Sequence, residues 1–271
     1  AATLPLMEAW SARGRPWLAS LHDVGFLCAD AFASEAAVPP ADGEWAGRWR
    51  EVLARSGAIT APSRFLANAF ARICVGLRAT VVEPGVDWPE PIAVPGDRPL
   101  RSIAVVGALG AHKGKQRLLR WLAHPDAAAY RWTLVGYTED QLQPGWIAEG
   151  RMWVHGPFDA AQTANWLRHY AVDLVLFPNQ LAESFSYALS DVWAAGVPVL
   201  VPDCGALGER VRAHGGGALL ADPDDAAALM RQLDQMRASA LVAEWETQIQ
   251  SRRAAMAPSK QGMVAAMDAQ Y

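Results

Sequence analysis

Residues 172–202 read VDLVLFPNQLAESFSYALSDVWAAGVPVLVP. Two short runs rich in β-branched and apolar residues, 172–178 and 197–202, flank a stretch (184–195) whose apolar residues recur at helical spacing. A strand, a helix and a second strand in this order are typical of a parallel sheet with crossover helices. This stretch therefore predicts a β-α-β unit.

The same alternation extends over most of the chain after Arg101. The predicted strands are 102–107, 131–136, 151–156, 172–178, 197–202 and 217–220. Helical patterns cover 115–124, 159–170, 184–195 and 206–214, and the chain reads as helical from 222 to about Met256. This is a complete Rossmann-like unit. In such units ligands bind at the carboxyl ends of the strands, where helix N-termini present unpaired N–H groups.

The first hundred residues predict a smaller unit of the same kind. Its strands are 16–24, 56–63 and 79–84, and its helices are 44–55 and 63–73. Three strands make a thin sheet for a parallel domain, whose strands are normally buried on both faces. We therefore expect this domain to be incomplete, with an upstream domain of the same polypeptide as its partner. Five prolines in 84–99 predict a linker.

These patterns predict three segments: an N-terminal domain (1–95), a Rossmann-like domain (96–257) and a terminal helix (258–271) that packs back on the N-terminal domain.

The net charge is −4, and the charged residues form no basic stripe along the sequence, which disfavours nucleic acid as a partner. The three cysteines lack CxxC spacing, so neither a disulfide framework nor a zinc site is predicted. No apolar run approaches the roughly 20 residues that span a bilayer. We expect a cytoplasmic protein, with peripheral association at the inner face of the membrane as an alternative.

The first candidate site surrounds the helix predicted at 184–195. Ser184 is a suitable N-cap, and Glu183 lies in the strand-to-helix loop. A carboxylate there can simply stabilise the helix end by about 0.3–1 kcal/mol. Asp191, however, would lie about 12 Å further along a continuous helix, where Asp is unfavourable. Two acidic groups on either side of an anion-binding helix start suit a ligand with hydroxyls at both ends and a phosphate between them.

The second candidate is GALGAHKGK (107–115), at the end of the first strand of the larger unit. Its glycines allow tight turns, and Lys113 adds a positive charge before the next helix. The order of residues is neither that of a P-loop nor that of GxGxxG, and a solvated turn is the simpler alternative.

The third candidate is His22, in LHDV (21–24). A metal-dependent phosphohydrolase would need further His and Asp ligands at suitable spacing, which we do not find, and a hydrogen-bonded strand-end histidine remains an alternative.

Together these motifs resemble those of retaining glycosyltransferases of the GT-B architecture, specifically glycosyltransferase family 4 (group 1), over nearly the whole chain. The motifs are ESFSYALSDVWAAGVPVLVPDCGALGERV (183–211), VGALGAHKG (106–114), LHDVGFLC (21–28), AITAPSRFLANAF (58–70) and VVEPGVD (81–87). The resemblance implies an α/β, GT-B-like fold with two Rossmann-like parallel-sheet domains, of which the N-terminal, acceptor-side one is incomplete. The larger domain would bind the nucleotide-sugar donor.

The resemblance also implies roles for single residues. Glu183 would contact the hydroxyls of the donor sugar, Lys113 would neutralise the leaving diphosphate, and His22 would reach the transferred sugar. Asp191 would bind the ribose. The remaining donor-binding residues would be Gly107 and Gly110 in the loop, Gly156, Pro157 and Phe158 beside the nucleobase, and Ser184, Phe185 and Ser186, whose backbone would hold the diphosphate.

The implied reaction moves a sugar from a nucleoside diphosphate to a glycan or lipid-linked acceptor with retention, without a metal or cofactor, in O-antigen- or capsule-like polysaccharide biosynthesis.

Three features of this sequence depart from the family pattern. Ala108 replaces the usual arginine, a loss of about 1.5–3 kcal/mol unless His112, Lys115 or another domain compensates. Asp191 replaces a glutamate, and the family's N-terminal strands and first loop are absent. Ala108 and the short first domain favour a non-catalytic nucleotide-sugar-binding module as an alternative. A GT-B-like epimerase acting on free nucleotide sugar is a third possibility.

Overall fold

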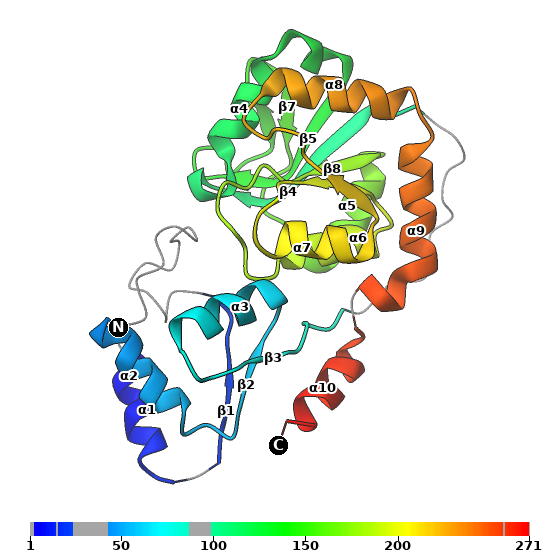
Figure 1. Ribbon diagram of the computed structural model, residues 1–271. Helices are drawn as coiled ribbons and strands as arrows, with labels where there is room; N and C mark the ends of the chain where they lie inside the picture. The colour runs from blue at the N-terminus through cyan, green and yellow to red at the C-terminus, as the bar shows by residue number, and fades with distance from the viewer. Residues whose placement is uncertain (1–2, 15, 24–42, 87–98, 257, 271) are drawn as a thin grey trace. The chain divides into compact units, whose positions relative to one another are not determined.

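The structure, a computed structural model, describes residues 3–14, 16–23, 43–86, 99–256 and 258–270 (Figure 1). The chain forms two compact units. One comprises Ala1–Gly85, Leu181–Phe185 and Pro258–Tyr271, and the other comprises Val86–Gln180 and Ser186–Ala257. Most of the predicted linker, the predicted boundary at 95/96 and the predicted helix break at Ala257 lie outside the described residues.

The larger unit contains a seven-stranded sheet in the order β10-β9-β8-β4-β5-β7-β6. The strands are β4 (Ser102–Leu109), β5 (Arg131–Thr138), β6 (Gly145–Ile147), β7 (Met152–Val154), β8 (Leu174–Leu176), β9 (Val199–Val201) and β10 (Gly217–Leu219). All pairs are parallel except β6 with β7, which is antiparallel. The six predicted strands are confirmed, whereas β6 was not predicted.

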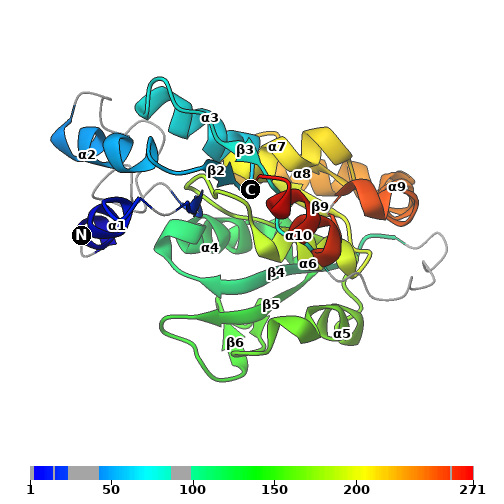
Figure 2. The same cartoon turned by 90° about the horizontal axis from the view of Figure 1, so that it is seen from below.

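Helices cover both faces of this sheet (Figures 1 and 2). They are α4 (Lys115–Ala123), α5 (Thr163–His169), α6 (Tyr187–Ala194), α7 (Gly205–His214), α8 (Ala226–Arg237) and α9 (Leu241–Met256), with short 3-10 turns η2 (Ala111–Lys113), η3 (Pro125–Ala129) and η4 (Ala160–Gln162).

The period-2 alternation of the strands explains the two layers of helices. Ile103 of β4 is buried in one core with residues of α4 and α8, whereas Ala104 faces a second core with residues of α5, α6 and α7. Leu174 and Val175 of β8 divide in the same way. The sheet is therefore buried on both faces, as its continuous apolar runs predict.

The smaller unit has a parallel sheet in the order β1-β2-β3, which confirms the predicted α/β class for this part of the chain too. Its elements are α1 (Thr3–Ser11), β1 (Leu18–Ser20), α2 (Glu44–Leu53), β2 (Ala58–Ala61), α3 (Arg64–Ile73), β3 (Thr80–Val81) and α10 (Lys260–Asp268). Trp17, Ile59 and Phe70 are buried in one core. Within the same unit, the amide of Gly85 donates to Sδ of Met263 in α10 over 3.2 Å.

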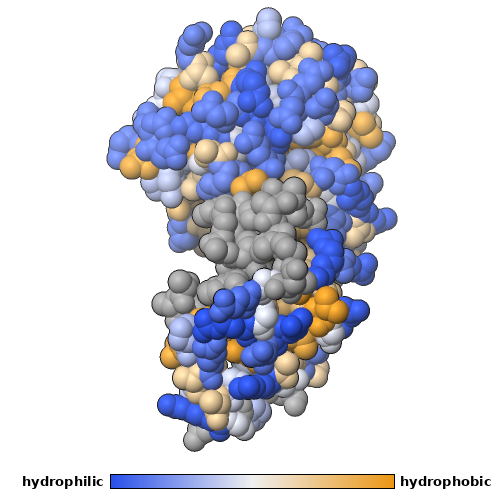
Figure 3. Space-filling model, turned by 60° about the vertical axis from the view of Figure 1, so that its left-hand side comes forward, coloured by the Kyte–Doolittle hydropathy of each residue, from blue (hydrophilic) through white to orange (hydrophobic). Residues whose placement is uncertain are grey.

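On the face shown in Figure 3, hydrophilic residues cover most of the coloured surface, and hydrophobic residues occur in small scattered groups. Of the helices that the structure describes, none combines the length and the apolar character needed to cross a bilayer.

Candidate functional site

The topology of the larger unit fixes where a ligand would bind. The chain proceeds from β4 to β5 and β7 on one side, and β8, β9 and β10 lie on the other side of β4. The order therefore reverses between β4 and β8, and ligands of open α/β sheets bind at the carboxyl ends of strands at such a point. The predicted loop at 107–115 starts within β4, which continues to Leu109, and the segment leading to α6 follows β8.

A row of glycines crosses the carboxyl ends of three strands. Gly107 of β4 pairs with Gly136 of β5, and the amide of Gly156, after β7, donates to the carbonyl of Gly136 over 2.8 Å. All three have positive φ, at 101°, 150° and 95°. A Cβ atom on Gly136 would lie 2.0 Å from the Gly107 carbonyl oxygen, whereas one on Gly107 would meet no atom within 4 Å. The structure thus brings the predicted residues Gly107 and Gly156 together through Gly136, which we did not predict, and leaves open space beside Gly107.

The loop after β4 contains a 3-10 turn that ends at Lys113. Gly114 follows with φ 84°, and a Cβ atom there would lie 1.8 Å from the carbonyl oxygen of Pro178. Only glycine therefore allows this loop to approach the segment after β8. Arg117 of α4, which is 6% exposed, also donates to the carbonyl of Pro178 over 3.2 Å and to that of Asn179.

Lys115 is not placed to replace the arginine that Ala108 lacks. Its ammonium, with the side chain 13% exposed, forms an ion pair with Asp140 and lies 3.7 Å from Glu139. Ala108 itself is exposed. Of the two compensating residues proposed within this loop, His112 and Lys115, the second is therefore committed to other partners.

The helix predicted from Ser184 begins later, at Tyr187, and its N-cap is Ser186. The prediction that Ser184 caps this helix is wrong, because its hydroxyl donates instead to the carbonyl of His22. Ser186 has φ 71° and ψ 90° and is 7% exposed, and its Oγ is a buried atom without a hydrogen-bond partner in the described structure. An orphaned buried hydroxyl costs about 1–3 kcal/mol, so this atom is suited to a ligand.

Arg210 of α7 supports the strained turn before α6. Its side chain is 1% exposed, and it donates to the carbonyl of Ser186 over 3.0 Å and to Oγ of Ser190 over 2.8 Å. The guanidinium carbon also lies 5.2 Å from the ring centroid of Trp193. A left-handed non-glycine residue costs roughly 1–3 kcal/mol, and these hydrogen bonds offset that cost.

Asp191 lies in α6 and is partly buried. Burial raises the pKa of its carboxyl to about 6. Among the described residues no hydrogen bond or ion pair of this carboxylate is found. A partly desolvated carboxylate of this kind is suited to accept hydrogen bonds from a ligand's hydroxyls.

In the smaller unit the structure brings together residues from distant parts of the sequence. Ser184 donates through Oγ to the carbonyl of His22, just after β1. Its own carbonyl accepts from Oγ of Ser63 over 2.6 Å, and Ser63 Oγ accepts from the amide of Leu66 to cap α3. Glu183 is partly buried beside Ser184, and Phe185 is 2% exposed. Glu183, Ser184 and Phe185 thus lie in the same compact unit as His22.

Beyond β7, the predicted nucleobase segment Gly156–Phe158 follows an aromatic cluster. The ring of His155 lies 6.1 Å from that of Phe158 and 4.0 Å from that of Trp166, measured between centroids. Its Nδ1 is 3.0 Å from the hydroxyl of Tyr170. Burial, together with the charge of His169, lowers the pKa of His155. A neutral imidazole in this cluster provides an apolar wall next to Phe158.

Within the described ranges, no group of three or more His, Cys, Asp or Glu side chains is arranged to hold a metal ion. A pocket of about 670 Å³ does occur, but it contains none of the predicted site residues and lies elsewhere on the sheet.

The model of the family described as "Glycosyl transferases group 1" matches residues 101–238. The chain belongs to this family. The match covers the elements from β4 to α8, and so both loops at the reversal of strand order. A search among curated proteins finds no matching sequence.

Several solved GT-B glycosyltransferase structures resemble this group 1 glycosyl transferase. HepE from Anabaena, in complex with UDP, is 18% identical with a TM-score of 0.71, and the match covers 97% of this chain and 77% of that one. Sucrose-phosphate synthase from Thermosynechococcus elongatus is 18% identical with a TM-score of 0.65, covering 97% and 69%. TarM from S. aureus is 10% identical with a TM-score of 0.70, covering 94% and 50%. At these identities the similarity shows a shared fold, and this chain spans half of TarM.

Sequence reasoning missed four residues that shape the site of this glycosyl transferase: Gly136, Arg117, Arg210 and Ser63. Gly136 could have been found, because it ends the predicted strand RWTLVG as Gly107 ends SIAVVG. The two arginines and Ser63 bind residues 20 to 121 positions away, and no local pattern signals such contacts.

Proposed function

We propose that this chain binds a nucleoside diphosphate sugar and transfers the sugar, with retention and without a metal, to a glycan or lipid-linked acceptor. The single observation that carries the proposal is the start of α6. There an orphaned buried hydroxyl, Ser186 Oγ, adjoins the unpaired N–H groups of a helix that leaves the point where the strand order reverses.

A diphosphate matches this helix start. The first amides of a helix have no intrahelical acceptors, and the helix dipole favours negative charge there. Phosphate oxygens would accept hydrogen bonds from these amides and from Ser186 Oγ. The carbonyl of Ser186 is bound by Arg210, so the turn is held in one conformation before the ligand arrives. Such preorganisation lowers the cost of binding.

From the diphosphate, the ligand would extend to the nucleoside on one side and to the sugar on the other. Asp191 would accept hydrogen bonds from the ribose hydroxyls, which suits its raised pKa because donors to the carboxylate replace the water it has lost. The open space beside Gly107 would let the ligand approach the strand ends, with Gly110 in the following loop and Gly156, Pro157 and Phe158 beside the base. Two HepE structures contain UDP with glucose and UDP-glucose, which makes uridine diphosphate sugars the first donors to test.

The proposed chemistry breaks the bond between the anomeric carbon and the phosphate oxygen and forms a bond from that carbon to the acceptor oxygen. The proton of the acceptor hydroxyl passes to the departing phosphate. Lys113 would stabilise the charge that develops on the diphosphate, Glu183 would bind the sugar hydroxyls, and His22 would contact the transferred sugar. Surface polysaccharide synthesis at the cytoplasmic side of the membrane is the setting we propose.

A second candidate is a related module that binds the donor without turnover. Ala108 and the ion pair of Lys115 with Asp140 favour it, because the loop then offers fewer cations to a leaving diphosphate. The two candidates share the donor site and differ only in the chemical step.

Release of glucose, or its transfer to an acceptor, from UDP-glucose separates these candidates. We expect turnover by the wild-type chain and a loss of at least about a hundredfold in Glu183→Ala, the scale typical of a lost contact that stabilises a transition state. Glu244→Ala, an exposed control in α9, should turn over like the wild type. UDP affinity without turnover would support the binding module. Equal turnover in Glu183→Ala and the wild type would remove the proposed role of Glu183.

A further inference from the structure

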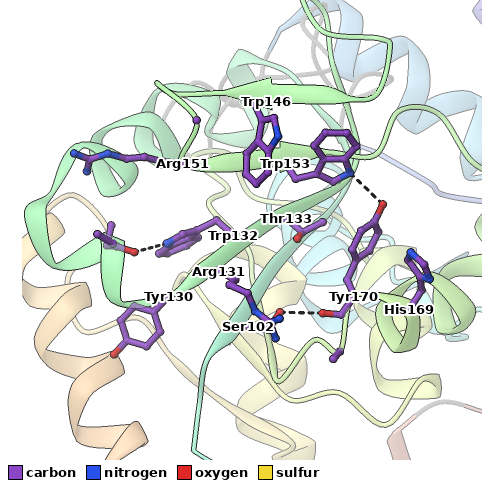
Figure 4. Close-up of a pocket in the computed structure, with 14 residues that line it drawn as sticks. Ser102, Tyr130, Arg131, Trp132, Thr133, Trp146, Arg151, Trp153, His169 and Tyr170 are labelled. Carbon is purple, nitrogen blue, oxygen red and sulfur yellow. Dashed lines mark hydrogen bonds between the residues drawn. The ribbon is translucent and has the colours of Figure 1, made fainter.

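The pocket of about 670 Å³ lies at the amino-terminal ends of strands of the large sheet, whereas the proposed donor site lies at their carboxyl ends. Its lining includes the first residues of two strands, Ser102 of β4 and Arg131 of β5, and Ala171 just before β8 (Figure 4). The donor site would lie at the carboxyl ends of the same strands, so the two sites are distinct. This volume is within the range of about 300–1,000 Å³ typical of small-molecule sites.

The register of the strands places an aromatic row along this pocket. Trp146 of β6 is directly opposite Trp153 of β7, and Trp153 is paired with Thr133 of β5. Residues paired in this way lie on one face of a sheet. Arg131 precedes Thr133 by two residues and so lies on the same face. The row therefore runs across three strands, from an indole at the sheet edge to a hydroxyl and a guanidinium further in.

The indole rings in this row are accessible. Trp146 is 63% exposed, which is unusual for so large an apolar side chain, and Trp153 is partly exposed. Their rings meet edge to face, with centroids 5.4 Å apart, which leaves ring faces available. Figure 4 shows both rings on one side of the hollow, with Tyr170 and His169 on another side and Trp132 and Tyr130 on a third.

Some polar groups of the pocket form hydrogen bonds within the protein, and others do not. Ser102 donates to the carbonyl of Tyr170, the indole of Trp153 donates to the hydroxyl of Tyr170, and Arg151 donates to the carbonyls of Leu122 and His124. Arg131 and the hydroxyl of Thr133 have no side-chain hydrogen bond or ion pair among the described residues. Arg131 and Thr133 thus remain available to a ligand beside the aromatic row.

The charged side chains of this pocket are cationic, because Arg131 and Arg151 line it. No aspartate or glutamate lines the pocket, and the guanidinium of Arg151 binds carbonyls at the C-terminal end of α4, which carries partial negative charge. A ligand with several hydroxyl groups can accept hydrogen bonds from Arg131 and from the hydroxyl of Thr133. Aromatic rings add an apolar surface of fixed shape.

We propose that this pocket binds an oligosaccharide, whose apolar ring faces stack on Trp146 and Trp153 and whose hydroxyls bind Arg131 and Thr133. The binding does not rest on the proposed donor chemistry. If that chemistry holds, the pocket anchors a part of the glycan remote from the reacting end, which raises the local concentration of acceptor.

Calorimetric titration of the full chain with maltohexaose, cellohexaose and chitohexaose tests this proposal. We expect at least one of the three to bind, with affinity reduced tenfold or more in Trp146→Ala and severalfold in Arg131→Ala. Trp10→Ala is the matched control, since Trp10 is 42% exposed in the smaller unit, and it should bind like the wild type. Trp146 lies in a three-residue edge strand, so its replacement should leave the fold intact, which circular dichroism checks.

The proposal is wrong if none of the three hexasaccharides binds, or if Trp146→Ala binds as tightly as the wild type. UDP titrations on the same preparations keep the two proposals apart. UDP affinity should be the same in Trp146→Ala and the wild type, and an absence of UDP binding with intact, Trp146-dependent oligosaccharide binding would reject only the donor site.

Discussion

The hydroxyl of Ser63 donates a hydrogen bond of 2.6 Å to the carbonyl oxygen of Ser184, a residue 121 positions later in the chain. The same hydroxyl accepts from the amide of Leu66 and so caps α3. One buried side chain therefore both begins a helix and fixes the residue next to Glu183.

We predict that Ser63→Ala lowers the free energy of unfolding by roughly 2 kcal/mol, about half from the lost cap and half from the lost hydrogen bond to Ser184. Ser259→Ala is the matched control, because Ser259 caps α10 through the amide of Gly262 and has no second role in the described structure. It should cost only about 1 kcal/mol. Donor turnover should fall in Ser63→Ala alone; equal turnover in both variants would show that the hydrogen bond to Ser184 does not position Glu183.

Gly114 is predicted to be irreplaceable for steric reasons. Gly114→Ala places Cβ 1.8 Å from the Pro178 carbonyl oxygen, whereas Gly150→Ala, at nearly the same φ (80° against 84°), meets no atom within 4 Å. Both variants carry the cost of about 1–2 kcal/mol of a left-handed alanine, and Gly114→Ala should cost a further 1–3 kcal/mol. Urea unfolding measures the difference, and similar stabilities would contradict the close approach of the two loops.

Arg210 should matter far more than its neighbour Arg212 on the same helix. Arg210 is buried and donates to Ser186 and Ser190, whereas Arg212 is exposed and pairs with exposed Asp203. We expect Arg210→Met to cost about 2–4 kcal/mol of unfolding free energy and Arg212→Met less than about 1 kcal/mol. Because Arg210 holds the turn at Ser186, UDP affinity should fall as well, and a destabilised Arg210→Met with unchanged UDP affinity would argue against that positioning role.

The carboxyl of Asp191 predicts a pH dependence. Its pKa is raised by burial to about 6, so the protonated form favours the fold, and this contribution to stability is lost as the pH rises from about 4 through 6. A bound ribose would favour the ionised form instead. The affinity for UDP-glucose, whose phosphates do not titrate in this range, should therefore fall below pH 6. Asp191→Asn should bind weakly at every pH between 5 and 8, with Asp268→Asn as an exposed control. A wild-type affinity that is constant from pH 5 to 8 would contradict the contact.

The larger unit is readable from the sequence because its strands have a strong local pattern. Runs such as SIAVVG and VDLVLFP are apolar on both faces, and such runs are typical of a buried parallel sheet. The first helix, α1, was not predicted; its Pro5 lies in the first turn, where proline is tolerated. The three-residue strand β6 is too short to show an alternating pattern.

The candidate site was predicted less completely for a physical reason. Glycine-rich strand ends and the acids around α6 leave a local pattern, but the contacts that hold them do not. Ser184 has the right chemistry for an N-cap, yet its hydroxyl binds the carbonyl of His22, and Ser186 begins the helix from a left-handed conformation that Arg210 stabilises. Tertiary hydrogen bonds thus overrode a local preference.

The most direct test of the donor site is calorimetric titration of the chain with UDP, GDP, ADP and the corresponding monophosphates. We predict that at least one diphosphate binds with one-to-one stoichiometry and at least tenfold more tightly than its monophosphate, and that Ser186→Ala weakens this binding roughly ten- to a hundredfold, as expected for a lost hydrogen bond to a charged group. No binding of any of these diphosphates, or equal affinity in Ser186→Ala and the wild type, would contradict a diphosphate site at the start of α6.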